Sequence, residues 1–271
     1  MDTRLTPSGV RMRLRAARPG SLNWLLLPGG PGIGSESLHA LADAMDVPGS
    51  IWLVDLPGDG SNLSSLPDPY AQWPQVLIEA ADAVPDAVYL GHSTGGMYLL
   101  ATPALHGRVR GIGLLDTAPD CSWHAEYVAM TQRDRLPAFE AALEHYERSP
   151  TLEHLTALVV ASAEWNFEPG SVAAGRELLA RMPYNRAAVE WSDAHFDHQY
   201  AAAWWPTDIP VLRLWGANDR IVSQAGWQAP RYTGAQVLAR EIPEAGHFPW
   251  IEQPQAVAEA MRAFAARILA G

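Results

Sequence analysis

The chain has 271 residues, 48% of them apolar and 18% charged, which is enough for one large α/β domain with an insertion. Its formal net charge of −11 argues against nucleic acid or an anionic membrane as partner, because both favour clustered Lys and Arg. There is no apolar signal core at the N-terminus, and no apolar run approaches the ~20 residues that span a bilayer. One cysteine, Cys121, excludes an intrachain disulfide and fits a reducing cytoplasm. We therefore expect a soluble, cytoplasmic protein that has neither nucleic acid nor a membrane as partner.

Short apolar runs recur along the chain and predict the strands of a sheet. Residues 10–16 alternate apolar and basic side chains, as expected of a half-exposed edge strand. The later runs do not alternate, which is typical of strands covered on both faces; they comprise residues 22–27, 51–54, 87–90, 112–115, 211–215 and 237–242. Helical patterns lie between them, at residues 36–44, 72–84, 95–104 and 255–269. The alternation predicts an α/β fold with a mostly parallel sheet flanked by helices, in which ligands bind at the carboxyl ends of the strands.

The stretch 121–205 interrupts this alternation. It shows helical patterns at 136–146, 152–163, 172–182 and 187–200, and no convincing parallel strand. Because a long excursion in a compact domain is usually functional, we expect a helical cap over the carboxyl edge of the sheet. The cap would be an insertion in a core made of residues 1–120 and 206–271. Long crossovers on the flank of the sheet are the alternative.

The hexapeptide Gly-His-Ser-Thr-Gly-Gly at residues 91–96 carries the most chemical information. It follows an apolar run and precedes a helical pattern, so it reads as strand, sharp turn and helix. On such a turn the hydroxyl of Ser93 is exposed at the carboxyl edge of the sheet, and the glycines on either side leave room for strained backbone. This is the pattern of a nucleophile elbow, so we expect Ser93 to be a catalytic nucleophile.

A serine nucleophile needs a base, and the base needs an orienting acid. In this arrangement the chain order is Ser, then Asp or Glu, then His. Asp219 follows the run 211–215 and His247 follows the run 237–242, so both lie at carboxyl ends of strands in the required order. We expect His247 to accept the Ser93 proton and Asp219 to hold its tautomer. Asp116, at the end of an earlier strand, is the alternative acid.

An oxyanion hole completes such a site. It uses the amide of the residue after the nucleophile, here Thr94, and an amide from the loop after an early strand. The run Pro-Gly-Gly-Pro-Gly at residues 28–32 is well placed for this role. Gly30 can turn its N–H toward a reacting carbonyl without a Cβ in the way.

With these motifs the chain resembles the α/β-hydrolase superfamily from about residue 22 to the C-terminus. The resemblance rests on residues 91–96, on Asp-Leu-Pro-Gly-Asp-Gly-Ser at 55–61, on the acid segment 216–222, on Gly-His-Phe-Pro at 246–249 and on Ile-Glu-Gln-Pro at 251–254. It implies the α/β-hydrolase fold with a Ser-Asp-His triad and no cofactor. The Gly-Gly-Pro-Gly run is also similar to the oxyanion segment of proline iminopeptidases, which hold a substrate's free amine with cap carboxylates.

The chain departs from these relatives at several positions. Pro28 stands where most members have His, His92 and Thr94 stand where the iminopeptidases usually carry Gly and Trp, and Asp59 stands where His is common. The resemblance implies that acids of the cap hold a substrate amine, and the candidates are Glu164, Glu168 and Glu190. The tryptophans of the cap are further candidates for lining a substrate pocket, namely Trp123, Trp165 and Trp191.

The sequence therefore predicts a serine hydrolase that cleaves an ester or amide bond of a small molecule through an acyl-enzyme. A carbon–carbon bond hydrolase of a ring-cleavage pathway is the alternative, which needs a cation for a dienoate, from Arg181, Arg186 or Arg220. A non-catalytic small-molecule receptor on the same fold is the alternative of another class. His195 and His198 flank Asp197, but no further His or Cys completes a metal site, so we expect a polar cap face there and no metal.

Overall fold

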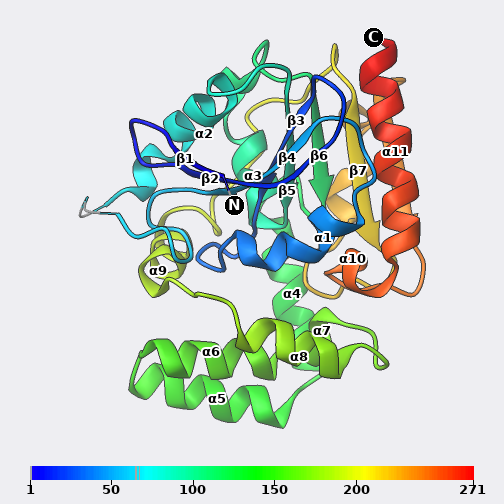
Figure 1. Cartoon of the computed structure of the whole chain (residues 1–271). Coiled ribbons are helices and arrows are strands. Elements are labelled where there is room, and N and C mark those ends of the chain that lie inside the picture. Colours follow the sequence, from blue (N-terminus) through cyan, green and yellow to red (C-terminus); the bar gives the residue numbers. More distant parts are fainter. Residues whose placement is uncertain (1, 65, 67) are drawn as a thin grey trace.

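An eight-stranded sheet runs through the centre of the computed structural model, which describes residues 2–64, 66 and 68–271 (Figure 1). Its strands are β1 (Thr3–Leu5), β2 (Arg11–Ala17), β3 (Asn23–Leu27), β4 (Ser50–Asp55), β5 (Ala87–His92), β6 (Gly111–Leu115), β7 (Val211–Gly216) and β8 (Val237–Ile242). They lie in the order β1-β2-β4-β3-β5-β6-β7-β8. β2 is antiparallel to both neighbours and the other pairs are parallel. The predicted mostly parallel sheet is confirmed. The run expected to form an edge strand is β2, which is not at the edge, because the short strand β1 pairs with its outer side.

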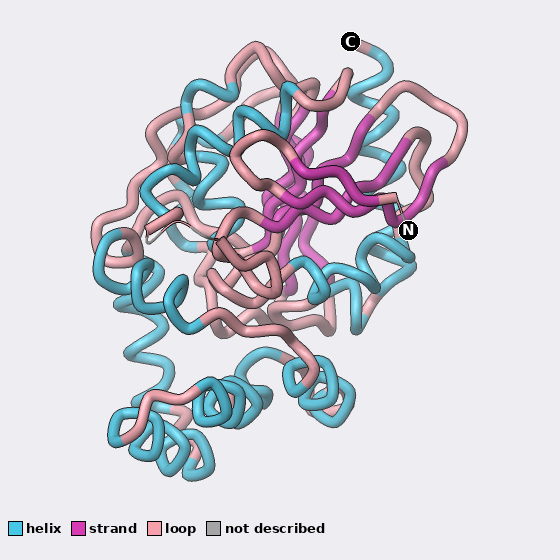
Figure 2. Tube along the Cα trace, turned by 60° about the vertical axis from the view of Figure 1, so that its left-hand side comes forward, coloured by secondary structure: helices cyan, strands magenta, loops and turns pink. Residues whose placement is uncertain are grey.

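Side chains alternate between two hydrophobic layers, one on each face of the sheet. On one face, strand residues such as Trp24, Leu53 and Val88 pack against α1 (His39–Ala44) and α11 (Pro254–Ala270). On the other, residues such as Leu25 and Tyr89 pack against α2 (Trp73–Asp82) and α3 (Thr94–Leu100). Because both faces are covered, the central strands consist of continuous apolar runs. Figure 2 shows this single twisted sheet with helices on both sides.

The strand register brings the loops that carry the candidate residues to one edge of the sheet. Leu27 pairs with Gly91, and His92 pairs with Leu115. The chain therefore leaves β3, β5 and β6 at neighbouring points, and β7 and β8 continue the same parallel series. The edge collects one loop from each strand, as parallel sheets require.

Between β6 and β7 the chain forms a series of helices. They are α4 (Ser122–Arg133), α5 (Pro137–Arg148), α6 (Leu152–Ala161), α7 (Ala163–Asn166), α8 (Val172–Ala180) and α9 (Arg186–His195). Figure 1 shows α5–α8 as a group beyond the carboxyl edge of the sheet, reached through α4. The helix expected at 187–200 ends at His195, and α4 was not among the expected helices. The remaining short elements are α10 (Pro249–Glu252) and 3₁₀ turns at Ser35–Leu38, Tyr70–Gln72, Pro103–Leu105, Ala225–Gln228 and Pro230–Tyr232.

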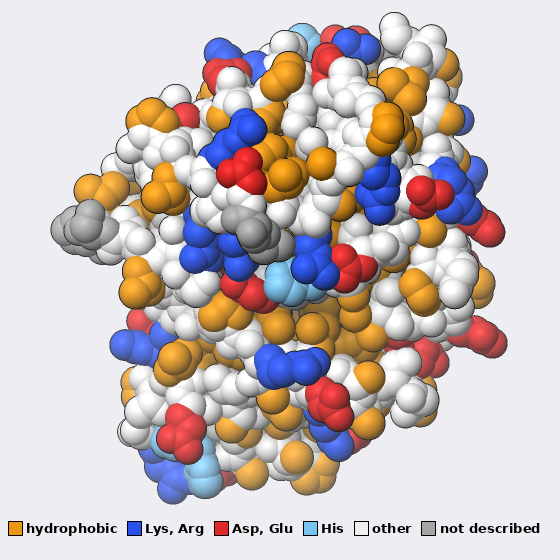
Figure 3. All heavy atoms as spheres, viewed as in Figure 1, with side chains coloured by type: hydrophobic (Ala, Val, Ile, Leu, Met, Phe, Trp, Pro, Cys, Tyr) orange, Lys and Arg blue, Asp and Glu red, His pale blue; other side chains and the backbone are white. Residues whose placement is uncertain are grey.

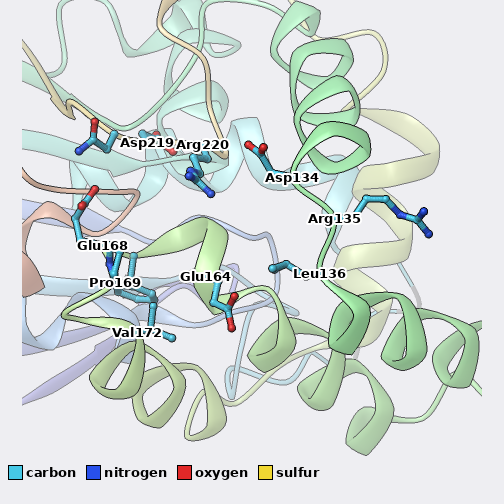
Figure 4. Close-up of a pocket in the computed structure, with 11 residues that line it drawn as sticks. Asp134, Arg135, Leu136, Glu164, Glu168, Pro169, Val172, Asp219 and Arg220 are labelled. Atoms are coloured by element: carbon cyan, nitrogen blue, oxygen red, sulfur yellow. The ribbon is translucent and has the colours of Figure 1, made fainter.

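Open grooves lie along the seam between these helices and the sheet domain, and two of them concern the site. One, of about 580 Å³, lies between α1 and α8, and its apolar side chains include Leu178, Met182 and Ile251. Figure 3 shows a hollow with hydrophobic side chains in its floor, between the sheet domain above and the group of helices below. The other groove, of about 880 Å³, lies near Glu168 and Arg220 (Figure 4). Across the described ranges, no helix combines the length and apolar character needed to cross a membrane.

Candidate active site

Ser93 occupies a strained turn between β5 and α3. Its backbone lies at φ 51° and ψ −125°, a region that L-residues rarely adopt. The N–H of Ser93 donates to the carbonyl of Leu115 at 2.8 Å, and the Thr117 hydroxyl donates to the Ser93 carbonyl at 2.7 Å. Two bonds from the neighbouring strand end therefore hold the strained residue in place.

The glycines around Ser93 are required by close backbone contacts. A Cβ on Gly91 would lie 2.5 Å from the backbone nitrogen of Gly96, and one on Gly95 would lie 2.3 Å from the carbonyl oxygen of Pro28. Larger residues would force the turn open, because backbone atoms cannot yield as flexible side chains do. The helix thus starts close against the loop after β3.

His247 and Asp219 form a buried hydrogen-bonded pair beside this turn. The Nδ1 atom of His247 lies 3.0 Å from Oδ2 of Asp219, and the two side chains are 5% and 1% exposed. The other carboxylate oxygen of Asp219 accepts hydrogen bonds from the backbone N–H groups of Ile221 and Val222. The carboxylate is thereby fixed toward the imidazole and leaves Nε2 free for a proton from substrate or nucleophile.

Asp116, the alternative acid, lies behind this pair rather than on the imidazole. One of its oxygens accepts a hydrogen bond from the Gly216 N–H at 2.8 Å. A carboxyl oxygen of Asp116, one of Asp219 and a ring nitrogen of His247 all lie within 4.8 Å of one another. Burial, together with the charge of Asp219, raises the pKa of Asp116 well above its usual range. Of the two candidate acids, Asp219 makes the hydrogen bond to His247.

The loop after β3 faces Ser93 as the oxyanion prediction requires. A Cβ on Gly29 would lie 2.7 Å from the Cβ of Ser93, and the Thr94 hydroxyl donates to the Gly30 carbonyl at 3.3 Å. The Gly32 N–H donates to the buried Asp59 carboxyl at 2.9 Å, which ties the loop to the turn after β4. Gly30 and Thr94 are therefore in direct contact, and both line the same cavity as the nucleophile.

These residues open on one cavity of about 380 Å³. Ser93, Thr94, Gly30 and His247 line it from the sheet side. The helical insertion supplies the opposite wall, which is mainly apolar and aromatic: Trp123, His124, Tyr127, Leu155, Val159, Ser162, Asn166, Leu179, Tyr184, Val189 and Asp197. A concave apolar site with a few polar groups is typical of small-molecule binding.

The cap residues expected to bind substrate are distributed over several places. Trp123 lines the cavity. Trp165 is buried among Tyr127 and Phe139 and donates its indole N–H to the Asp134 carbonyl. Trp191 packs against Tyr70 and Trp73 of the sheet domain.

None of the three expected glutamates lines this cavity. Glu164 forms an exposed ion pair with Arg176 at 2.7 Å, and Glu190 pairs with Arg186 one helical turn away. Glu168 borders the larger groove instead, as Figure 4 shows. The structure does not bring these carboxylates to Ser93, since surface arginines already pair with two of them.

Sequence reasoning missed Asp197, the one carboxylate whose residue lines the cavity among the described parts of the chain. It accepts a hydrogen bond from the Ser192 hydroxyl at 2.9 Å, and burial raises its pKa. The His-Phe-Asp-His segment was interpreted as an exposed polar face. His195 and His198 are indeed exposed, but Asp197 between them turns inward.

Comparison with known proteins places these features in context. A family model described as "Alpha/beta hydrolase family" matches residues 24–260. The pimeloyl-[acyl-carrier protein] methyl ester esterase of Xanthomonas axonopodis pv. citri is 30% identical over 225 residues, covering 80% of this chain and 85% of the relative. The enzyme of the same name from Xylella fastidiosa is 28% identical over 236 residues, covering 81% and 86%.

Solved structures with the same fold include a proline iminopeptidase-related protein from Thermus thermophilus. Its TM-score is 0.74 at 22% identity, covering 99% of this chain and 98% of that one. An esterase from Rhodococcus sp. ECU1013 has a TM-score of 0.70 at 22% identity, covering 99% of this chain and all of that one.

Proposed function

Because the chain belongs to the alpha/beta hydrolase family and is a hydrolase, we propose that it is a carboxylic-ester hydrolase with Ser93 as its nucleophile. The observation that carries this proposal is geometric. A serine held at positive φ and the imidazole of His247, which is bonded to the buried Asp219 carboxylate, line the same cavity. The proposal also draws support from two curated relatives that are named as methyl ester esterases.

The chemistry follows from the positions of these groups. His247 Nε2 takes the proton of the Ser93 hydroxyl as the oxygen attacks the ester carbonyl. The backbone N–H groups of Gly30 and Thr94 would stabilise the resulting oxyanion. Collapse breaks the bond to the alcohol, which leaves with the proton from the imidazole. Water, deprotonated by His247, then hydrolyses the acyl-enzyme and releases the acid and free Ser93.

The cavity indicates the class of substrate. At about 380 Å³ with largely apolar and aromatic walls, it suits a small or medium acyl group without strong charge. Arg181, Arg186 and Arg220 lie outside the set of residues that line it, so the dienoate-binding cation of a carbon–carbon hydrolase lacks a counterpart among the described cavity residues. This arrangement favours an ester over a dienoate.

A second candidate, hydrolysis of an aminoacyl bond with a free N-terminal amine, is favoured by Asp197. A carboxylate in an apolar cavity would attract a protonated amine, because an opposite charge offsets the cost of its burial. Asp197 rather than Glu164, Glu168 or Glu190 would then bind the amine. The structural relative from Thermus thermophilus is consistent with this candidate.

One experiment tests both candidates. Short-chain p-nitrophenyl esters and aminoacyl-naphthylamides, including the prolyl compound, are assayed with wild type, Ser93→Ala and Asp197→Asn. We expect ester turnover that Ser93→Ala abolishes. Turnover of the aminoacyl amides that Asp197→Asn weakens through KM would favour the second candidate.

The remaining outcomes decide against the proposal. Activity on neither class, together with no covalent labelling of Ser93 by a fluorophosphonate, would refute a serine hydrolase and leave a small-molecule receptor. Labelling without turnover of either class would direct the search to carbon–carbon bond substrates.

A further inference from the structure

A single carboxylate, that of Glu252, bridges the helical insertion and the loop of the catalytic histidine. Glu252 is the last residue of α10 and is partly buried. One of its oxygens accepts a hydrogen bond from the Gly246 N–H at 2.6 Å, and the other accepts one from the Glu168 N–H at 2.7 Å. Gly246 immediately precedes His247, whereas Glu168 lies just beyond α7. Both carboxylate oxygens are therefore used, one on each side of the seam.

The two backbone segments that meet at Glu252 are also in direct contact. The His247 N–H donates to the Asn166 carbonyl at 2.8 Å. A Cβ on Gly246 would lie 2.4 Å from that same carbonyl oxygen, so only glycine allows this approach. Phe167 stacks on Phe248 with ring centroids 5.1 Å apart and an interplanar angle of 15°. Residues 166–168 and 246–248 thus form one continuous contact.

This contact lies between the two grooves of the seam. Phe167 and Glu168 border the groove of about 880 Å³ shown in Figure 4, and Ile251, next to Glu252, borders the groove of about 580 Å³. The hydrogen bonds of Glu252 therefore join the two sides of the seam beside the stacked pair of Phe167 and Phe248.

The same contact reaches the substrate. Asn166 and Ser162 line the catalytic cavity, and the Asn166 amide donates to both the carbonyl and the hydroxyl of Ser162. The backbone that accepts from His247 therefore belongs to a residue in the cavity wall. A shift of this wall would move the imidazole relative to Ser93.

We propose that Glu252 is a positioning residue that holds the His247 loop and the insertion's cavity wall in one catalytic arrangement. The inference rests on the proposed function of His247 as the base. Two N–H donors require two acceptor oxygens, so Glu252 holds both segments in its ionised carboxylate form. A misplacement of about 1 Å at a catalytic group can cost on the order of 10²-fold in rate.

The surroundings of Glu252 oppose its charge. Burial is the main cause that raises its pKa, and the nearby Glu168 carboxylate adds to the shift, whereas the two N–H groups and the Ser171 hydroxyl act against it. The charge of Glu252 also contributes to the raised pKa of Asp116, after burial and the charge of Asp219. As pH falls through the raised pKa of Glu252, this residue gains a proton and one of the two acceptors is lost.

Glu252→Gln tests the proposal with minimal change of shape. In the glutamine, the side-chain oxygen can accept from one of the two N–H groups. The side-chain NH₂ group then faces the other N–H and cannot accept from it. We expect kcat on a p-nitrophenyl ester to fall by about 10- to 100-fold with KM nearly unchanged. Glu259→Gln, which alters a carboxylate on the neighbouring helix α11 outside these contacts, is the matched control and should behave as wild type.

The pH profile separates positioning from a merely structural role. In wild type, protonation of Glu252 at its raised pKa adds to the loss of activity as pH falls, so log(kcat/KM) should fall more steeply on the acid side than in Glu252→Gln. Glu252→Gln has no such carboxyl to titrate. Active-site titration with a fluorophosphonate corrects for any unfolded fraction. A variant with wild-type kcat and an unchanged acid slope would overturn the proposal.

Hydrogen exchange supplies a readout that does not need turnover. We expect peptides that contain residues 246–248 and 166–168 to exchange faster in Glu252→Gln than in wild type or Glu259→Gln. Unchanged exchange would overturn the proposal, whether or not wild type hydrolyses an ester. Absence of ester hydrolysis by wild type would by itself contradict only the proposed function.

Discussion

Replacing Asp59 by Asn should stabilise the protein increasingly as pH rises. Asp59 follows β4 and is only 3% exposed, and its carboxyl accepts the Gly32 N–H of the loop beside Ser93. Burial, reinforced by the charge of Asp55, raises its pKa to about 8. Asn is neutral and keeps an oxygen that can accept from Gly32. It therefore preserves the contact and removes the cost of protonating this carboxyl on folding.

The magnitude follows from linkage between protonation and folding. The unfolded chain releases the Asp59 proton near pH 4, whereas the folded protein keeps it until about pH 8. Between these values the folded state binds one more proton, so this group lowers the free energy of unfolding by about 1.4 kcal/mol per pH unit as pH rises. Asn cannot titrate. The advantage of Asp59→Asn should therefore grow by about 3 kcal/mol from pH 5.5 to 7.5 and level off above pH 8.

Urea denaturation at half-unit steps from pH 5 to 9 measures this difference directly. Glu259→Gln is the control, since it removes a carboxylate on α11 that makes no contact with the loop and should show no comparable trend. A stability difference between Asp59→Asn and wild type that stays constant with pH would refute the reasoning. It would mean that Asp59 is ionised in the folded protein at neutral pH.

Three further predictions concern the site itself. Asp219→Asn should lower kcat on a p-nitrophenyl ester by roughly 10⁴-fold while the fold survives, because the partner that fixes the His247 tautomer is lost; steady-state kinetics with circular dichroism checks this. Gly95→Ala should lower the free energy of unfolding by about 1–3 kcal/mol, because the new Cβ would lie 2.3 Å from the Pro28 carbonyl oxygen; wild-type urea stability would contradict it. His92→Gln should reduce the decrease in the free energy of unfolding as pH falls. Burial lowers the pKa of His92 well below its usual range, so below about pH 6.5 the unfolded state gains a proton that the folded state does not; pH-dependent denaturation measures the difference.

The strand-end loops could be predicted from the sequence because their cause is local. Continuous apolar runs mark strands buried on both faces, and the carboxyl ends of parallel strands must share an edge. Ser93, Asp219 and His247 each follow such a run, so their proximity needs no knowledge of side-chain packing. β1 escaped prediction because its three residues are exposed and carry no apolar run.

The cavity wall could not be predicted in the same way, because its causes are tertiary. Glu190 lies four residues after Arg186, a spacing that favours an ion pair on the surface of a helix. This spacing is visible in the sequence and is an alternative to a role for Glu190 in substrate binding. Asp197 turns inward because α9 ends at His195 and the chain bends there, so helical periodicity no longer applies. Which face of each insertion helix meets the sheet depends on contacts that span the whole chain.

The two carboxyls near His247 illustrate how packing, rather than residue type, decides which of them hydrogen-bonds to the imidazole. Asp116 and Asp219 both follow parallel strands, and sequence alone leaves them as alternatives. Asp219 receives two backbone N–H bonds and faces the imidazole, so its negative charge is stabilised. Asp116 receives one N–H bond in a fully buried position, and the neighbouring anion raises its pKa. Asp219 is therefore the carboxylate that contacts the imidazole, in the position from which it can stabilise an imidazolium.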